Sequence, residues 1–277
     1  MTGGGAALMG AIFIGARHGR FGLGTGDTDM PGHSSVLAVL GTFILWFGWY
    51  GFNGVSTLSY SAMGTASRVC VTTTLSAAAG GATGLFLYAL HHNSLDLTPA
   101  LNGILGGLVG ITAGCDMVQP YAAIVIGCVS GLVYYYSAAG LKWLRVDDPL
   151  DASPIHFFCG MWGVISVGLL TDDSLDSDSC GILYGCTGTL LWNQLAGVVA
   201  IAAWTCTLSG LLFFTLGRLD LLRVPLNEEL EGLDVSHHGG QAYHFSQRRQ
   251  SIGSTEQKET YITHVPVQSN AIAPVSN

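Results

Sequence analysis

Long apolar runs without charge alternate with short polar segments along most of this 277-residue chain. A helix rises about 1.5 Å per residue, so about 20 apolar residues cross the roughly 30 Å core of a bilayer. The pattern predicts an all-α, polytopic helical membrane protein. The predicted membrane domain is 1–219, with a partial span at 1–16 and six spans near 34–52, 69–90, 97–114, 118–141, 154–170 and 187–217.

Composition agrees with a membrane location. Only 10% of the residues are charged, against about a quarter in soluble domains, and 39 residues are glycine. Glycine is favoured where helices pack closely in lipid. No basic patch points to nucleic acid, and no Cys/His spacing points to zinc. We therefore expect the lipid bilayer as a partner, and neither a cofactor nor a metal.

Lysine and arginine are distributed unevenly between the loops. If the loop with Arg17 and Arg20 is cytoplasmic, alternation of the spans leaves only Arg68 outside, out of ten basic residues. The positive-inside rule then places the C-terminus in the cytosol. Residues 220–246, which mix charge, Gly and His, are predicted to be a cytosolic regulatory tail. Residues 247–277, which are polar and rich in Ser, Thr and Gln, are predicted to be disordered.

The seven cysteines form no evident disulfide framework. Cys180 and Cys186 flank an outside segment and Cys115 lies near another, which leaves room for one oxidised pair. The other four are expected to be buried and reduced: Cys70, Cys128, Cys159 and Cys206.

One histidine, His156, lies inside an apolar run that follows three carboxylates and two prolines. An ionisable side chain inside a bilayer costs several kcal/mol unless it faces a cavity or a partner. Its default interpretation is therefore functional, and a core histidine satisfied by its neighbours is the alternative.

Aromatic residues crowd the outer end of the span at 34–52. An interfacial belt would place them there too, but Gly48 and Gly51 among them thin the helix for close packing. A face formed by Trp49, Phe52 and Ser56 could hold a small cation through ring quadrupoles and a hydroxyl.

Residues 41–53 resemble the signature span of ammonium transporters of the Amt/Mep/Rh family, in its plant-like Amt branch. The similarity continues through Gly-Ile-Thr-Ala-Gly-Cys-Asp at 110–116, through the turn at 146–149 with Asp151 and His156, and through the tail at 231–243. It covers most of residues 1–243, and four separated matches in the right order are specific.

The resemblance implies a fold of eleven helices, built from two inverted five-helix halves around a narrow pore and a long final helix. It implies selective ammonium uptake by trimers, and we expect the plasma membrane. Against this fold the chain lacks most of the first five-helix repeat. We expect that Met1 is an internal methionine of a longer protein, so that the chain is N-terminally truncated.

The resemblance also implies roles for single residues. His156 matches the second histidine of a pair at mid-pore. Trp49 and Ser56 match members of the outer recruitment site, and Phe52 matches one ring of the gate below it. Structural support is implied for three further residues: Asn53, Asp148 and Asp151.

Two places in the chain depart from the family pattern. Gly54-Val55 reverses the position of a small residue before Ser56, and Phe157 and Phe158 stand where small residues are common. Bulk at these two positions could narrow the pore.

Three functions are compatible with this pattern. The first is ammonium transport, as part of a longer chain. The second is a non-conducting ammonium-sensing or regulatory subunit assembled with full-length partners. The expected assembly is a homotrimer, or a heterotrimer with a full-length paralogue. For that role Ser236 matches a regulatory threonine of plant relatives. The third is an intramembrane enzyme with His156 as base and Cys159 one turn on, but no further acid, base or ligand accompanies them. We therefore expect no enzyme.

Overall fold

A computed structural model of the chain describes residues 1–22, 27–175 and 180–240. The described part is helical, with only an isolated bridge between Phe21 and Asp27, which confirms the all-α prediction. The chain forms two compact units, Met1–Gly232 and Leu233–Asn277. The predicted disordered segment 247–277 and the end of the predicted tail, 241–246, lie outside the described residues.

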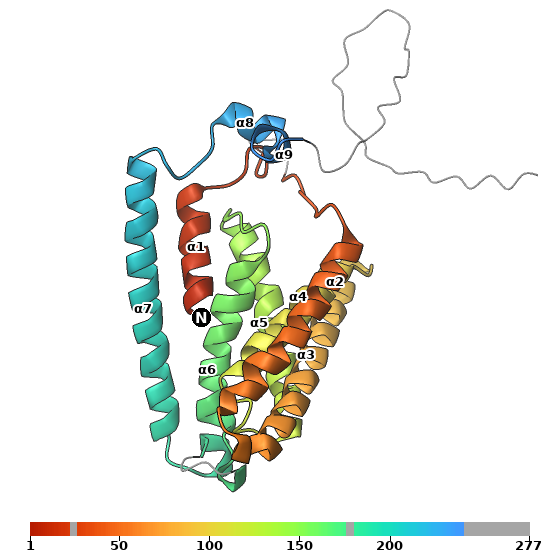
Figure 1. Cartoon of the computed structure of the whole chain (residues 1–277), viewed down its shortest axis with the longest axis vertical. Helices are drawn as coiled ribbons and strands as arrows, with labels where there is room; N and C mark the ends of the chain where they lie inside the picture. The colour runs from red at the N-terminus through yellow and green to blue at the C-terminus, as the bar shows by residue number, and fades with distance from the viewer. Residues whose placement is uncertain (23–26, 176–179, 241–277) are drawn as a thin grey trace, which may run out of the picture. The chain divides into compact units, whose positions relative to one another are not determined.

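The α-helices of the first unit (Figure 1) are α1 (Thr2–Ile14), α2 (Ser35–Trp49), α3 (Met63–His92), α4 (Leu97–Thr112), α5 (Pro120–Trp143), α6 (Cys159–Leu170), α7 (Thr189–Arg218) and α8 (Leu226–Glu231). Two π-helical segments are η1 (Tyr50–Gly54), which follows α2, and η4 (Ser153–Phe158), which precedes α6. Short 3-10 turns are η2 (Val55–Thr57), η3 (Tyr60–Ala62), η5 (Asp173–Leu175) and η6 (Ile182–Tyr184). The second unit holds α9 (Leu233–Ser236).

Five helical segments of the described chain are long and apolar enough to cross a membrane: Ser35–Thr57, Tyr60–His92, Pro120–Trp143, Ser153–Leu170 and Thr189–Arg218. Helices α1 and α4 are apolar but shorter, with 13 and 16 residues. At about 1.5 Å per residue, α4 rises about 24 Å, which is less than a bilayer core. The chain after Thr112 continues as turns.

Helix α3 is longer than the apolar run that predicts a span at 69–90. It begins at Met63, so Arg68 lies within its first two turns. The Arg68 guanidinium donates through Nη2 to the Asp116 carbonyl oxygen at 2.8 Å. The charged end of the side chain therefore has a polar partner in the turn after α4. With its charge satisfied there, Arg68 can be part of α3, which begins before the apolar run.

Helices α3, α4 and α5 pack with their backbones in direct contact. A Cβ added at Gly107 would lie 2.3 Å from the Ser76 carbonyl oxygen, and one added at Gly103 would lie 2.5 Å from the Gly80 carbonyl oxygen. The Ser76 hydroxyl donates to the Gly107 carbonyl at 2.8 Å. In lipid, such close approach supplies the van der Waals contact that holds helices together.

Helix α1 lies beside α7 (Figure 1), and its first turn is set against η4. A Cβ at Gly4 would lie 2.1 Å from the Phe157 backbone nitrogen, so only glycine fits there. Phe157 is buried against this helix, within 3.3 Å of a Cβ placed at Gly5. Helix α1 therefore packs directly against the π-helical segment that carries His156.

Cys180 and Cys186 form a disulfide, while Cys115 is a buried free thiol. Cys159 is buried, as expected. The expectation of burial is wrong for three other free thiols, which are only half-buried: Cys70, Cys128 and Cys206.

We predict that Gly107→Ala lowers the stability of the folded protein by about 1–3 kcal/mol, because the added methyl overlaps the Ser76 carbonyl. The measurement is the thermal unfolding midpoint in detergent. Gly140→Ala is the matched control, since a Cβ there meets nothing within 4 Å. Equal midpoints for the two variants would contradict the close packing of α3 against α4.

Candidate functional site

A cavity of about 510 Å³ lies between α2, α4 and the η4–α6 segment. Its walls are mostly apolar, and the side chains that bring chemistry to it are Trp49, Phe52, Thr112 and His156. The structure thus brings together three of the residues that the sequence singled out. They come from segments about a hundred positions apart.

Two aromatic rings form one wall of this cavity. Trp49 ends α2 and Phe52 lies in η1, and their ring centroids are 6.0 Å apart at an interplanar angle of 77°. This edge-to-face arrangement is one that aromatic pairs prefer. Phe52 is 61% exposed, so more than half of its surface is not covered by other residues.

His156 faces the same cavity from η4, where it is half-buried. A π-helical turn in a helix frequently marks a functional site, and here both η1 and η4 carry cavity residues. Phe157 and Phe158 do not line the cavity, and Phe157 packs on α1 instead. These two side chains therefore do not narrow this cavity.

Ser56 and Asn53 lie outside the cavity lining. Ser56 is in the 3-10 turn η2, and its hydroxyl donates to the Phe52 carbonyl. Asn53 is 2% exposed, and its Nδ2 donates to Thr73 Oγ1 at 3.1 Å. This contact fastens η1 to α3.

Thr112 is a cavity residue that the sequence did not single out. The Trp49 indole Nε1 donates to Thr112 Oγ1 at 2.9 Å, and Thr112 Oγ1 donates to the Leu108 carbonyl at 2.7 Å. Thr112 lies inside the motif at 110–116, but nothing in that motif indicates the partner of its hydroxyl.

Asp148 holds the start of the segment that carries His156. Its carboxylate accepts from the backbone nitrogens of Ala152 at 3.1 Å and Ser153 at 2.7 Å. The first amides of a helical segment have no partner within it, and a carboxylate there satisfies them.

Asp151 is half-buried, with a left-handed backbone at φ 52°. Its Oδ2 accepts from Asn102 Nδ2 at 3.0 Å and from the Tyr134 hydroxyl at 3.1 Å. Burial raises the pKa of Asp151 above its usual value, although the hydrogen bond from Tyr134 opposes the shift. Asp151 therefore joins the turn to α4 and α5, through two partners that the sequence did not reveal.

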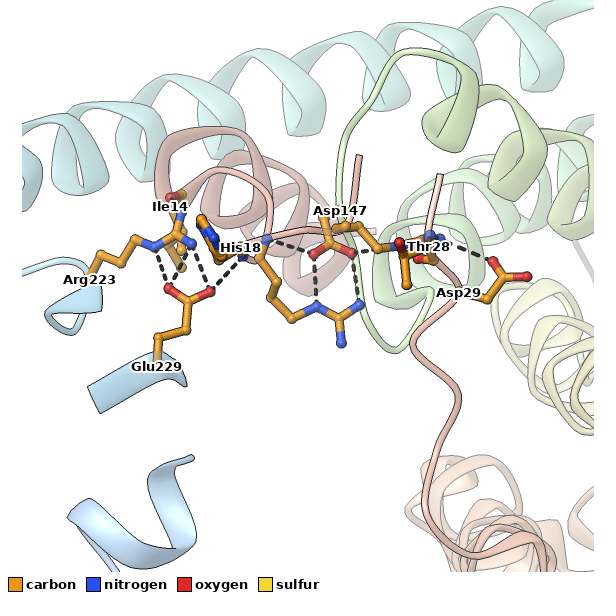
Figure 2. A network of polar contacts seen from close by, with 9 residues as sticks. Ile14, His18, Thr28, Asp29, Asp147, Arg223 and Glu229 are labelled. Carbon is orange, nitrogen blue, oxygen red and sulfur yellow. Dashed lines mark hydrogen bonds and ion pairs between the residues drawn. The ribbon is translucent and has the colours of Figure 1, made fainter. Parts of the chain in front are cut away.

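Asp147, the neighbour of Asp148, is held by Arg17 (Figure 2). Asp147 accepts from the Arg17 backbone nitrogen at 2.9 Å, from Nε at 2.8 Å and from Nη2 at 2.9 Å. Arg20 Nε lies 3.6 Å from its second oxygen. Burial alone would raise the pKa of Asp147, but the hydrogen bonds and charge of Arg17 outweigh it, so the pKa lies below its usual value.

A second part of this network joins the end of α1 to α8 (Figure 2). Glu229 accepts from the His18 backbone nitrogen at 2.7 Å and pairs with the Arg223 guanidinium at 2.8 Å. Arg223 Nη1 also donates to the Ile14 carbonyl at 3.1 Å, which satisfies an orphan acceptor at the end of α1. The chain after α7 is therefore fastened to the loop that follows α1.

Cys159, the candidate nucleophile of the enzyme hypothesis, does not face the cavity. Its buried thiol donates to the Ser130 carbonyl at 3.4 Å, on the side of α5. Within the described residues, no group of three or more His, Cys, Asp or Glu side chains could hold a metal ion.

The sequence model described as "Ammonium Transporter Family" matches residues 1–243 of this chain. Ammonium transporter 3 of Dictyostelium discoideum is 43% identical over 245 residues, which cover 85% of this chain and 57% of that protein. Ammonium transporter 1 member 4 of Arabidopsis thaliana is 38% identical over 268 residues, which cover 89% of this chain and 53% of that protein.

Solved structures are similar over the same region. A protein described as "Sensor Amt Protein" is 32% identical with a TM-score of 0.77, covering 85% of this chain and 57% of that one. Mep2 of Candida albicans is 31% identical with a TM-score of 0.72, covering 81% and 50%. The chain thus spans about half the length of the relatives and solved structures it matches.

We predict that Asp147→Asn lowers the stability of the folded protein by about 1–3 kcal/mol at pH 7, because it leaves the Arg17 donors without their charged acceptor. Asp151→Asn should cost less than about 1 kcal/mol, because the amide oxygen can still accept from Tyr134 and resembles the protonated acid that burial favours. The measurement is the unfolding midpoint in detergent, with Asp173→Asn, at an exposed position of the 3-10 turn η5, as the control.

The two carboxylates should also respond oppositely to acid. A lowered pKa means that the stabilisation by Asp147 is complete above about pH 4 and is lost as the pH falls further. A raised pKa means that, as the pH falls, the folded chain takes up the Asp151 proton before the unfolded chain does. This group therefore raises the free energy of unfolding as the pH falls towards about 4. A stability loss of equal size and pH dependence in both variants would contradict this assignment.

Proposed function

The chain belongs to the ammonium transporter family, and from that premise we propose that it serves the selective passage of ammonium through the cavity that Trp49, Phe52 and His156 share. The meeting of these three side chains in one apolar cavity is the observation that carries the proposal. Members of the family are transporters, and we propose transport without chemical conversion here. With its apolar helices, the chain is a multi-pass membrane protein.

The proposed mechanism starts from the cost of dehydration. An ammonium ion that enters an apolar cavity loses water at a cost of several kcal/mol unless the protein replaces those contacts. The ring faces of Trp49 and Phe52 replace part of them through cation–π attraction, worth about 0.5–2 kcal/mol each. His156 lines the same cavity, where a neutral imidazole can accept a hydrogen bond or a proton from the transported species.

The supporting residues have distinct proposed tasks. Asp148 fixes the segment of His156 through its two amide contacts, and Asp151 fastens the same turn to α4 and α5. Asn53 fastens η1, and so Phe52, to α3. Ser56 lies one turn beyond Phe52, outside the cavity, where we propose that it belongs to the outer entrance rather than to the wall.

We further propose a plasma membrane location with the C-terminus in the cytosol. Several basic residues gather at the end of the first unit where α7 ends: Arg17, Arg20 and Lys142. Basic residues favour the cytosolic side of a membrane, so this end is proposed to face the cytosol. We propose assembly as a homotrimer, or as a heterotrimer with a full-length paralogue.

A second candidate function is an ammonium-sensing or regulatory subunit that does not conduct. One of its solved relatives is described as "Sensor Amt Protein", and this likeness, with a TM-score of 0.77, supports the candidate. Flux measurements separate the two. A transporter carries ammonium, whereas a regulatory subunit changes only the flux of its full-length partner.

We predict that His156→Ala reduces ammonium uptake at least tenfold, because the cavity loses its only imidazole among the lining residues of the described chain. Phe52→Ala should reduce it several-fold by removing one ring face. The measurement is uptake of nitrogen-15 ammonium by cells without their own uptake system, expressing the chain alone or with a full-length relative. His92→Ala, at the end of α3, is the control. Wild-type uptake by the His156 variant would contradict the proposed path.

The tail offers a proposed switch at Ser236, the last residue of α9. A phosphate there would add negative charge two residues from Asp234, and repulsion between the like charges would change the local structure of the tail. We predict that Ser236→Asp lowers uptake in the same assay, while Ser236→Ala does not. Identical uptake by Ser236→Asp and the wild type in a conducting assembly would remove the switch.

A further inference from the structure

Two polar side chains of the cavity wall are bonded to each other. The Trp49 indole Nε1 donates to Thr112 Oγ1 at 2.9 Å, while the single proton of Thr112 is used on the Leu108 carbonyl at 2.7 Å. Thr112 therefore meets Trp49 as an acceptor. The indole N–H is the only polar group of that ring, and this contact occupies it within the wall.

Other contacts leave the Trp49 ring little freedom to turn. One side packs against the buried cluster that includes Val109, Tyr134 and Ile155. Phe52 stands edge-to-face to it at 6.0 Å. With packing and a ring contact already present, the hydrogen bond to Thr112 decides which edge of the indole points into the wall.

The orientation matters because an indole is not electrically uniform. Its faces carry the negative part of the quadrupole and attract cations, whereas its edge, and above all the N–H, is positive. An N–H turned into the cavity would oppose an entering ammonium ion. An N–H held by the wall leaves a face for the ion.

We propose that Thr112 is a positioning residue for ammonium: its hydroxyl holds the Trp49 indole so that the ring face, and not the N–H, is presented to the cavity. Thr112 suits this task because it closes α4, beside the cavity, and its own bond to Leu108 fixes the hydroxyl. The inference rests on the proposed function, since it assumes that ammonium enters this cavity.

The test follows the indole nitrogens of the six tryptophans by nitrogen-15 NMR, in the full chain in detergent micelles. Trp49→Phe identifies the Trp49 signal. Thr112→Val, which keeps the shape and removes the hydroxyl, should shift that signal, and Thr112→Ser should restore it. Thr42→Val is the matched control, because the buried Thr42 hydroxyl also donates to a carbonyl four residues earlier, at Ala38, but lies outside the cavity.

Ammonium chloride is then titrated into each variant. In the wild type, the Trp49 signal should move with ammonium chloride and not with sodium chloride. In Thr112→Val, half of the movement should require about three- to tenfold more ammonium, the range expected from one lost hydrogen bond. Thr42→Val should titrate like the wild type.

Two results would overturn the inference. One is a Trp49 signal in the wild type that ignores ammonium, and the other is an unchanged midpoint in Thr112→Val. If Thr112→Val does not fold, Thr112→Ala removes the same hydroxyl with less bulk and is read in the same way. The proposed function is tested separately by ammonium flux. Normal flux together with an unchanged titration midpoint in Thr112→Val would contradict only the role of Thr112. A Trp49 signal that titrates with ammonium in a chain that never supports flux would contradict only transport.

Discussion

Three carboxylates in one five-residue turn hold the segment that carries His156, and each has its partners in a different part of the chain. Asp147 pairs with Arg17 after α1, Asp148 accepts the first amides of η4, and Asp151 accepts from Asn102 on α4 and Tyr134 on α5. A polar group near hydrocarbon costs several kcal/mol if it lacks a partner, so each pairing constrains where its element can lie. The position of His156 depends on all three.

The cavity follows from that constraint together with the glycines. Backbone contact between α3 and α4, at Gly103 and Gly107, fixes α4, and with it Thr112. Gly4 lets α1 support η4 from behind. The wall that faces the cavity is then left with few polar groups: its indole N–H donates to its one hydroxyl, and that hydroxyl donates to the Leu108 carbonyl. Under the proposed function, such a surface recognises ammonium through ring faces and one imidazole.

The sequence predicted the fold well because span length and the distribution of charge are properties of local composition. His156 was singled out for a related reason: an ionisable group in an apolar run is conspicuous without any structure, and the structure places this residue on the cavity wall. Trp49 and Phe52 were singled out as ring faces that could hold a cation, and both line the cavity. Ser56 was grouped with them, but the change from π-helix to 3-10 turn between η1 and η2 separates it from the cavity. Helix periodicity assumes a regular helix and cannot anticipate such a change.

The partners that complete the site were beyond the sequence for a different reason. Thr112 lies 63 positions from Trp49, and Arg17 lies 130 positions from Asp147. Threonine is common wherever membrane helices pack, and an arginine after a span is expected from charge distribution alone, so neither residue indicates its partner. Pairing depends on the rotation of each helix about its axis, which close glycine contacts decide and hydropathy does not. The residues that set the orientation of an aromatic ring are therefore the last that a sequence reveals, although the electrostatics of an aromatic cation site depends on that orientation.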